Sequence, residues 1–294
     1  MSETAAVTRA PRKRSKRARP RLDFWAWLGV CIVLTGLFLV VFGPYLAPYQ
    51  VGQIVPGATQ FMPPSSETLM GTDILGRDVF TRLLYGARLT VGVALAATIL
   101  GFLLGMAVGF SAAEIRGRYD DFVTWLIDVF LSFPPILLAL IVIAALSSDL
   151  WVLICTIAVI HSSRVARIGR AVAMNVAALE FVEVARARGE NLLSILVREI
   201  WPSTIRPLAV EFGLRMTYSI LFLSSLSFLG LGIQPPDADW GSMVKENLNG
   251  IQTGAYLSVL APAFAIAILT VGVNLIVDWL GSQSGRSISE ELTK

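Results

Sequence analysis

Long apolar runs without charge restrict the folds open to this chain more than any other feature. Residues 24–47 and 89–113 contain no charged side chain, and residues 122–146 contain only Asp128. A helix needs about 20 apolar residues to cross the hydrocarbon core of a bilayer. Further runs raise the number of expected spans to six, at 150–163, 208–233 and 255–277. With 55% hydrophobic and only 15% charged residues, the chain is predicted to be an all-α, multi-pass membrane protein.

Basic residues are concentrated on one side of these spans. If the N-terminus is cytoplasmic, the cytoplasmic segments carry nineteen of the 24 Lys and Arg, eight of them in the first 21 residues. Positive charge marks the cytoplasmic side of membrane proteins, so both termini are expected there. The basic tail is expected to lie on an anionic membrane face and not to bind nucleic acid. The first apolar run is longer than the roughly 7–15 residues of a cleaved signal, so we expect it to remain as an anchor.

The spans and the charges together predict how the chain is divided. The expected order is a basic cytoplasmic tail (1–23), a first transmembrane helix (24–47), an external loop with an amphipathic helix (48–88), a core of five helices (89–281) and a cytoplasmic C-terminal tail (282–294). The core includes a large cytoplasmic loop, 164–206. In the external part, Trp240 is expected to lie at the membrane interface or against a partner protein.

One cytoplasmic stretch, "FVEVARARGENLLSILVREIWPS" at 181–203, carries many charges between apolar runs. Its apolar residues recur at helical spacing, Gly189 interrupts them, and Pro202 is expected to end the second half. The pattern predicts a helix, a glycine turn and a second helix. From periodicity alone, an amphipathic loop lying on the lipid surface is an equal alternative.

This stretch resembles the EAA loop of binding-protein-dependent ABC importers, with matching residues at Glu183, Ala185, Ala187, Gly189, Ile195 and Pro202. It differs from that pattern at Val184, where Ala is expected, and at 199–201, where a run containing His is common. Three other segments resemble the second inner-membrane subunit of dipeptide and oligopeptide permeases: "LMGTDILGRDVFTRLLYGARLT", "DVFLSFPPILLAL" and "LSFLGLGIQPPDADWGSMV". The resemblance covers residues 69–280.

The resemblance implies a permease subunit with the type I ABC importer fold in the bacterial cytoplasmic (inner) membrane. Its implied partners are a second, related permease that completes a heterodimer, two cytoplasmic ATP-binding subunits, and an extracytoplasmic solute-binding protein. Short peptides are the implied solutes. Nickel complexes, opines and oligosaccharides travel through related permeases and are alternative solutes. The residues implied to couple to the ATPase are Phe181, Glu183, Val184, Ala185, Arg186, Ala187, Arg188 and Gly189.

Missing motifs restrict the chemistry of the chain itself. It has no GxxxxGK[ST] phosphate loop, so ATP and Mg²⁺ are expected on the partner ATPases, and we expect neither a cofactor nor an enzymatic site here. Its two cysteines lie far apart without CxxC spacing, which predicts no metal site. An ion-driven secondary transporter would need functional intramembrane carboxylates and repeated halves, and no clear internal repeat is present. A membrane scaffold that transports nothing is the third class of function considered, after an ABC importer permease and an ion-driven transporter.

Polar and small residues within the spans are candidates for the translocation path or for packing. Glu211 and Arg215 lie four residues apart and are expected to pair. Pro134 and Pro135 should kink or break the third run. Gly101, Gly105 and Gly109 share a helix face, which predicts close packing within the subunit or across a dimer. The candidates for the path are Asp128, Ser132, Pro134, Ser224 and Ser225.

Overall fold

The computed structural model describes residues 23–292, with side chains up to residue 283. Most of the expected basic tail lies outside the described residues. Within them the chain forms helices and loops, with only two isolated β-bridges. The helices are α1 (Phe24–Leu46), α2 (Val79–Ile115), α3 (Gly117–Ser132), α4 (Pro135–Ala145), α5 (Leu150–Ala177), α6 (Glu180–Ala187), α7 (Leu192–Ser194), the π-helix η1 (Ile195–Ile200), α8 (Trp201–Leu229), α9 (Trp240–Glu246), the 3₁₀-helix η2 (Leu248–Ile251) and α10 (Tyr256–Leu292).

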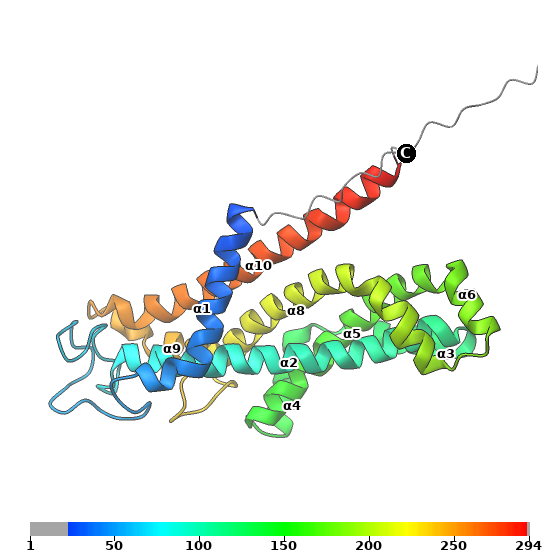
Figure 1. The fold of residues 1–294 in the computed structure, drawn as a ribbon. Coiled ribbons are helices and arrows are strands. Elements are labelled where there is room, and N and C mark those ends of the chain that lie inside the picture. The colour runs from blue at the N-terminus through cyan, green and yellow to red at the C-terminus, as the bar shows by residue number, and fades with distance from the viewer. Residues whose placement is uncertain (1–22, 293–294) are drawn as a thin grey trace, which may run out of the picture.

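The helix bundle has two distinct ends, which are visible in Figure 1. The short helix α9 lies with the loop 47–78 at one end, and α6 lies at the opposite end. We call these the α9 end and the α6 end. The helix α10 leaves the bundle at an angle, and α1 crosses both α10 and α2. The expected all-α architecture is therefore confirmed.

The two helices α2 and α5 pack against each other along much of their length. A Cβ atom added at Gly101 would lie 2.7 Å from the carbonyl oxygen of Ala158, and one added at Gly105 would lie 2.6 Å from that of Ser162. Gly109 repeats this pattern one turn later. The small-residue face is thus used for close packing within the subunit. Along this contact the residue numbers of α2 and of α5 increase together, so the two helices run in the same direction.

The helices α3 and α4 form a bent pair that together is long and apolar enough for one span. They meet at 86° around Pro134 and Pro135, where the missing N–H groups interrupt the helical hydrogen bonds. Since α2 and α5 run in the same direction, the chain between them must return from the α6 end to the α9 end. The bent pair makes that return; counted as one span, it brings to six the helices that are long and apolar enough to span a membrane in the described part of the chain.

The helix α2 is longer than the sequence predicted. The amphipathic helix expected before residue 88 and the span expected from residue 89 form one continuous helix of 37 residues. It begins at Val79 because the Asp78 side chain accepts a hydrogen bond from the backbone N–H of Thr81, at 2.7 Å. The boundary predicted at residue 88 is therefore not a break in the structure.

The prediction that Pro202 ends a helix is wrong. The chain from Leu192 to Leu229 is one helical segment of 38 residues, and Pro202 lies in the first turn of α8. Proline has no N–H to donate to the preceding turn, and here it follows a wider, π-helical turn. The π-helix η1 comes directly before it, and the N–H of Trp201 donates to the carbonyl of Leu196, five residues back. This wider turn brings the chain into α8 without a stop.

The expected pair within α8 is present. The Nε atom of Arg215 lies 2.7 Å from a carboxylate oxygen of Glu211, and both side chains are buried. The guanidinium of Arg215 also lies 4.7 Å from the centre of the Tyr218 ring. The two charges therefore compensate each other inside the protein.

Candidate functional site

The helix α6 forms the tip of the structure at the α6 end (Figure 1). It has eight residues, with Glu180 and Glu183 in its first turn and Arg186 in its last turn. This order of charges complements the helix dipole, which is positive at the N-terminus and negative at the C-terminus. A helix this short is not stable alone in water, so tertiary contacts must hold it.

The inward face of α6 supplies those contacts. Val182 and Ala185 are completely buried, in a core cluster that includes Ala177, Ile195 and Ile200. This cluster joins the end of α5 to α6 and η1. The helix is therefore fixed to the bundle by apolar packing on one side.

An ion pair adds to this attachment. The guanidinium of Arg186 donates two hydrogen bonds of 2.7 Å to the carboxylate of Glu114 near the end of α2, and a third of 3.1 Å to the carbonyl of Ala177. The bonds to Glu114 raise the pKa of Arg186 above its ordinary value. Two-pronged pairing of this kind fixes orientation as well as distance. It ties α6 directly to α2.

The outward face of α6 is largely exposed, and its one ion pair among the described residues is that of Arg188 with Glu190, at 2.8 Å. Phe181 is 41% exposed and Val184 is 53% exposed, and they point away from the bundle with Glu183, Ala187 and Arg188. The outward face of α6 therefore carries two exposed apolar side chains with charged residues beside them.

Ala185, one of the residues implied to couple to the ATPase, does not lie on the outward face of α6. Its relative exposure is 0%, because it lies on the same helix face as Val182 and packs into the core. Arg186 is likewise engaged within the subunit. Of the residues predicted to couple, these two support the helix from behind.

Gly189 turns the chain after α6, as predicted. Its φ is +76°, in the left-handed region that favours glycine. The N–H of Gly189 donates to the carbonyl of Arg186 at 2.9 Å, and the N–H of Glu190 donates to that of Ala185 at 3.2 Å. These two bonds form a Schellman motif. Asn191 then caps the next helix by accepting from the N–H of Ser194 at 2.8 Å.

The five residues predicted for the translocation path do not line one cavity. Asp128 pairs with Arg167. Ser132 and Ser225 donate to carbonyls of their own helices, both at 2.7 Å. Pro134 is exposed at the bend of the broken crossing, whereas Ser224 is buried and its backbone packs against Gly241 of α9. The structure therefore separates Ser224 from the other four, which lie on exposed faces.

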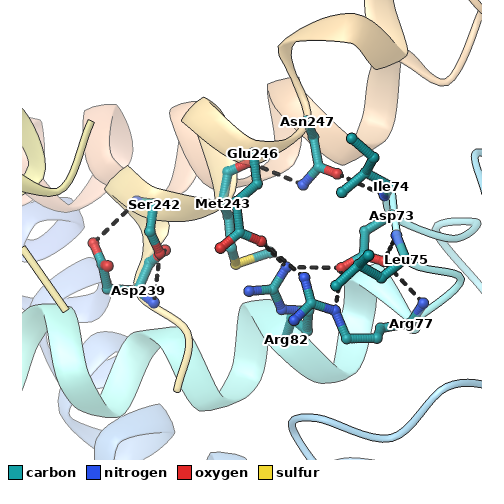
Figure 2. A network of polar contacts seen from close by, with 10 residues as sticks. All are labelled: Asp73, Ile74, Leu75, Arg77, Arg82, Asp239, Ser242, Met243, Glu246 and Asn247. Atoms are coloured by element: carbon teal, nitrogen blue, oxygen red, sulfur yellow. Dashed lines mark hydrogen bonds and ion pairs between the residues drawn. The ribbon is translucent and has the colours of Figure 1, made fainter. Parts of the chain in front are cut away.

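Sequence analysis missed a buried charge network at the α9 end, which Figure 2 shows. The Nε of Arg77 and one terminal nitrogen of Arg82 both bind Asp73, at 2.6 Å and 2.7 Å. The same two guanidinium groups bind Glu246 of α9, at 2.8 Å and 2.7 Å. Asn247 accepts from the N–H of Ile74 at 3.1 Å. The charges of the two Arg and the two carboxylates cancel, and they lock the loop before α2 onto α9.

The position predicted for Trp240 is wrong. Its side chain is 3% exposed, and its indole N–H donates to the carbonyl of Leu83 at 3.0 Å. Asp239 caps α9 by accepting from the N–H groups of Gly241 and Ser242, at 2.9 Å and 3.3 Å. Burial raises the pKa of Asp239 above its ordinary value. The tryptophan therefore holds α9 against α2 and is not available to a partner.

Known proteins resemble this chain over most of its length. It is 38% identical over 253 residues to a putative peptide transport system permease protein of Brucella suis, covering 85% of this chain and 84% of the relative. It is 32% identical over 285 residues to a glutathione transport system permease protein of Pectobacterium atrosepticum, covering 94% of each. A dipeptide transport system permease protein of Bacillus subtilis is 33% identical over 256 residues, which is 87% of this chain and 79% of the relative.

A solved structure has the same fold. Inward-facing conformations of the MetNI methionine ABC transporter match with a TM-score of 0.53 and 16% sequence identity, over 68% of this chain and 96% of that one. Residues 101–289 match the family described as "Binding-protein-dependent transport system inner membrane component". This match covers about two thirds of the chain and includes α6 together with the turn at Gly189. The chain therefore belongs to the family of binding-protein-dependent transport system inner membrane components.

Proposed function

We propose that this chain is the permease subunit of an ATP-driven importer of short peptides. The observation that carries the solute class is the similarity to permeases named for peptides, dipeptides and glutathione, at 32–38% identity over 85–94% of the chain. The chain would form part of the path through the membrane, and a second, related permease would complete it. An extracytoplasmic solute-binding protein would deliver the peptide at the α9 end.

The outward face of α6 is the proposed contact with a cytoplasmic ATP-binding subunit. Phe181 and Val184 would enter a groove on that subunit, with Glu183, Ala187 and Arg188 around them. An apolar anchor in a groove with a charged rim is how short helices bind other proteins. The core packing of Val182 and the ion pair of Arg186 with Glu114 support this proposal, because a contact that transmits force must be firmly attached on its other side.

The partners supply the chemistry that this chain lacks. Two separate ATP-binding subunits would hold ATP and Mg²⁺ and hydrolyse the nucleotide beneath the α6 end. The proposed orientation places the α6 end and both termini in the cytoplasm. It is supported by the basic residues, since the segments assigned to the cytoplasm carry nineteen of the 24 Lys and Arg.

Reconstitution tests the function directly. The complete complex, with its second permease, ATPases and binding protein, is placed in proteoliposomes, and uptake of a radiolabelled dipeptide is measured with and without ATP. We expect uptake that needs both ATP and the binding protein. A complex whose ATPase activity responds to the binding protein loaded with a nickel complex or an oligosaccharide, and never with a peptide, would contradict the peptide assignment.

A further inference from the structure

A groove of about 450 Å³ opens at the α9 end, between α2, the start of α5 and the loop that leads into α9. Its wall on α2 includes Tyr85, Arg88 and Gly92, its wall on α5 includes Leu150 and Ile154, and the loop contributes Asp237. Small-molecule sites in proteins have volumes of about 300–1,000 Å³ and are mainly apolar with a few polar groups. This groove has the size and the composition of such a site.

The spacing of the residues on α2 explains how the groove is formed. Tyr85, Arg88 and Gly92 are separated by three and four residues, so they lie along one face of the helix. A Cβ atom added at Gly92 would meet nothing within 4 Å, whereas the packing glycines of the same helix leave no such space. The absence of a side chain at Gly92 therefore keeps the groove open.

The charges of the groove have no partners within the part of the chain described by the structure. Arg88 and Asp237 are both exposed, and neither makes a hydrogen bond or an ion pair there, either with the other or with a third group. By contrast, the neighbouring Arg77 and Arg82 are buried and both form ion pairs with Asp73 and Glu246. One cation and one anion thus remain free on the same groove, at different points of its wall.

We propose that this groove is a binding site for short zwitterionic peptides entering the permease. Arg88 binds the peptide α-carboxylate, and Asp237 binds the α-ammonium group. Tyr85, Leu150 and Ile154 contact the peptide between its termini. A guanidinium matches the geometry of a carboxylate with two parallel hydrogen bonds, and a carboxylate accepts well from an ammonium group. The inference rests on the proposed function, and it adds the recognition of both peptide termini by the permease itself.

Direct binding tests the inference. The complex of two permeases and two ATPases in nanodiscs, without the binding protein, is titrated with a radiolabelled dipeptide, its C-terminal amide and its N-acetyl form. We expect Arg88→Gln to weaken binding of the free dipeptide at least about tenfold and to abolish the preference for it over the amide. Asp237→Asn should have the same effect relative to the N-acetyl form. Gly92→Leu, which fills the groove, should weaken binding of all three ligands.

Controls separate the possible failures. Arg118→Gln changes an exposed Arg at the α6 end and should leave all three affinities unchanged. Membrane abundance and thermal stability of each variant show that the fold is intact. The inference is overturned, while the proposed function stands, if the wild-type complex imports dipeptides and the groove variants bind dipeptides with the same affinity as the wild type. A loss of binding-protein affinity with unchanged peptide binding would also overturn it, because the groove would then be a protein contact. Failure of the wild-type complex to import any peptide would instead refute the proposed function.

Discussion

Val184 and Ala185 are neighbours in the chain, yet they lie on different faces of α6. Val184 is 53% exposed, while Ala185 is buried in the core cluster that attaches the helix to the bundle. A substitution at each position therefore reports on a different property. The outward position reports on contact with a partner, and the inward position reports on the fold.

The first prediction compares Val184→Glu with Ala185→Glu. Ala185→Glu should lower the abundance of the chain in the membrane, because burying an unpaired carboxylate costs several kcal/mol. Val184→Glu should leave abundance and thermal stability unchanged, but it should reduce co-purification of the ATP-binding subunit and peptide uptake at least about tenfold. Quantitative blotting, co-purification and uptake assays measure the three properties. Full uptake by Val184→Glu at normal abundance would show that α6 is an ordinary surface helix.

The second prediction concerns the turn at Gly189. A Cβ atom at this position would meet nothing within 4 Å, so the cost of a side chain lies in the backbone conformation alone. Gly189→Val should destabilise the turn by about 1–2 kcal/mol, since an L-residue resists a φ of +76°. Gly189→Asn should be tolerated, because Asn adopts this conformation more readily. Measurement of ATP hydrolysis stimulated by the loaded binding protein checks the difference, and equal activity of the two variants would contradict the role given to backbone strain.

Secondary structure was predicted more accurately than the direction in which side chains point. The apolar runs and the sequence around Gly189 predicted the helices and the turn, because helix length, helical spacing and glycine act locally. Which face of α6 is buried depends on contacts with Glu114 and Ile200, and spacing alone does not choose between two faces. For the same reason the path candidates were not separated into buried Ser224 and exposed Ser225.

The network at the α9 end was beyond sequence analysis for a different reason. Asp73, Arg77 and Arg82 lie close together in the sequence, but Glu246 is 164 residues from Arg82. Nothing local indicates which carboxylate completes the cluster. The sequence did contain one local signal. Charged residues recur at 73, 77, 78 and 82, immediately before an apolar span. Charges that only face water have no reason to keep such a regular spacing.

The third prediction tests how this network holds the loop onto α9. Glu246→Gln removes the negative charge shared by Arg77 and Arg82, and it should destabilise the protein by about 1–3 kcal/mol because two buried cations are left with one carboxylate. Glu67→Gln changes an exposed Glu of the same loop and should have no effect. Thermal unfolding of the purified complex and limited proteolysis of the loop measure the result. Unchanged stability of Glu246→Gln would show that Asp73 alone is sufficient.

The orientation of the whole molecule gives the fourth prediction. In a background where the two free cysteines, Cys31 and Cys155, are replaced by Ala, single cysteines are introduced as Leu193→Cys at the α6 end and Thr59→Cys at the α9 end. Leu193 is 70% exposed, so a cysteine there is accessible from its own side of the membrane. An impermeant thiol reagent should label Thr59→Cys in intact spheroplasts and Leu193→Cys only after permeabilisation. Labelling of Leu193→Cys from outside would reverse the topology and exclude the proposed ATPase contact.

The unbroken length of α2 has a mechanical consequence. At 1.5 Å per residue, its 37 residues make a rod about 55 Å long, nearly twice the thickness of the hydrocarbon core. Arg82, in the charge network, lies near one tip, and Glu114, which binds Arg186 of α6, lies near the other. A tilt of about 5° about one tip moves the other by about 5 Å over this length. A rod of this length would act as a lever arm: a rotation of a few degrees at the α6 end would displace the α9 end by several Å, enough to change the width of an opening there.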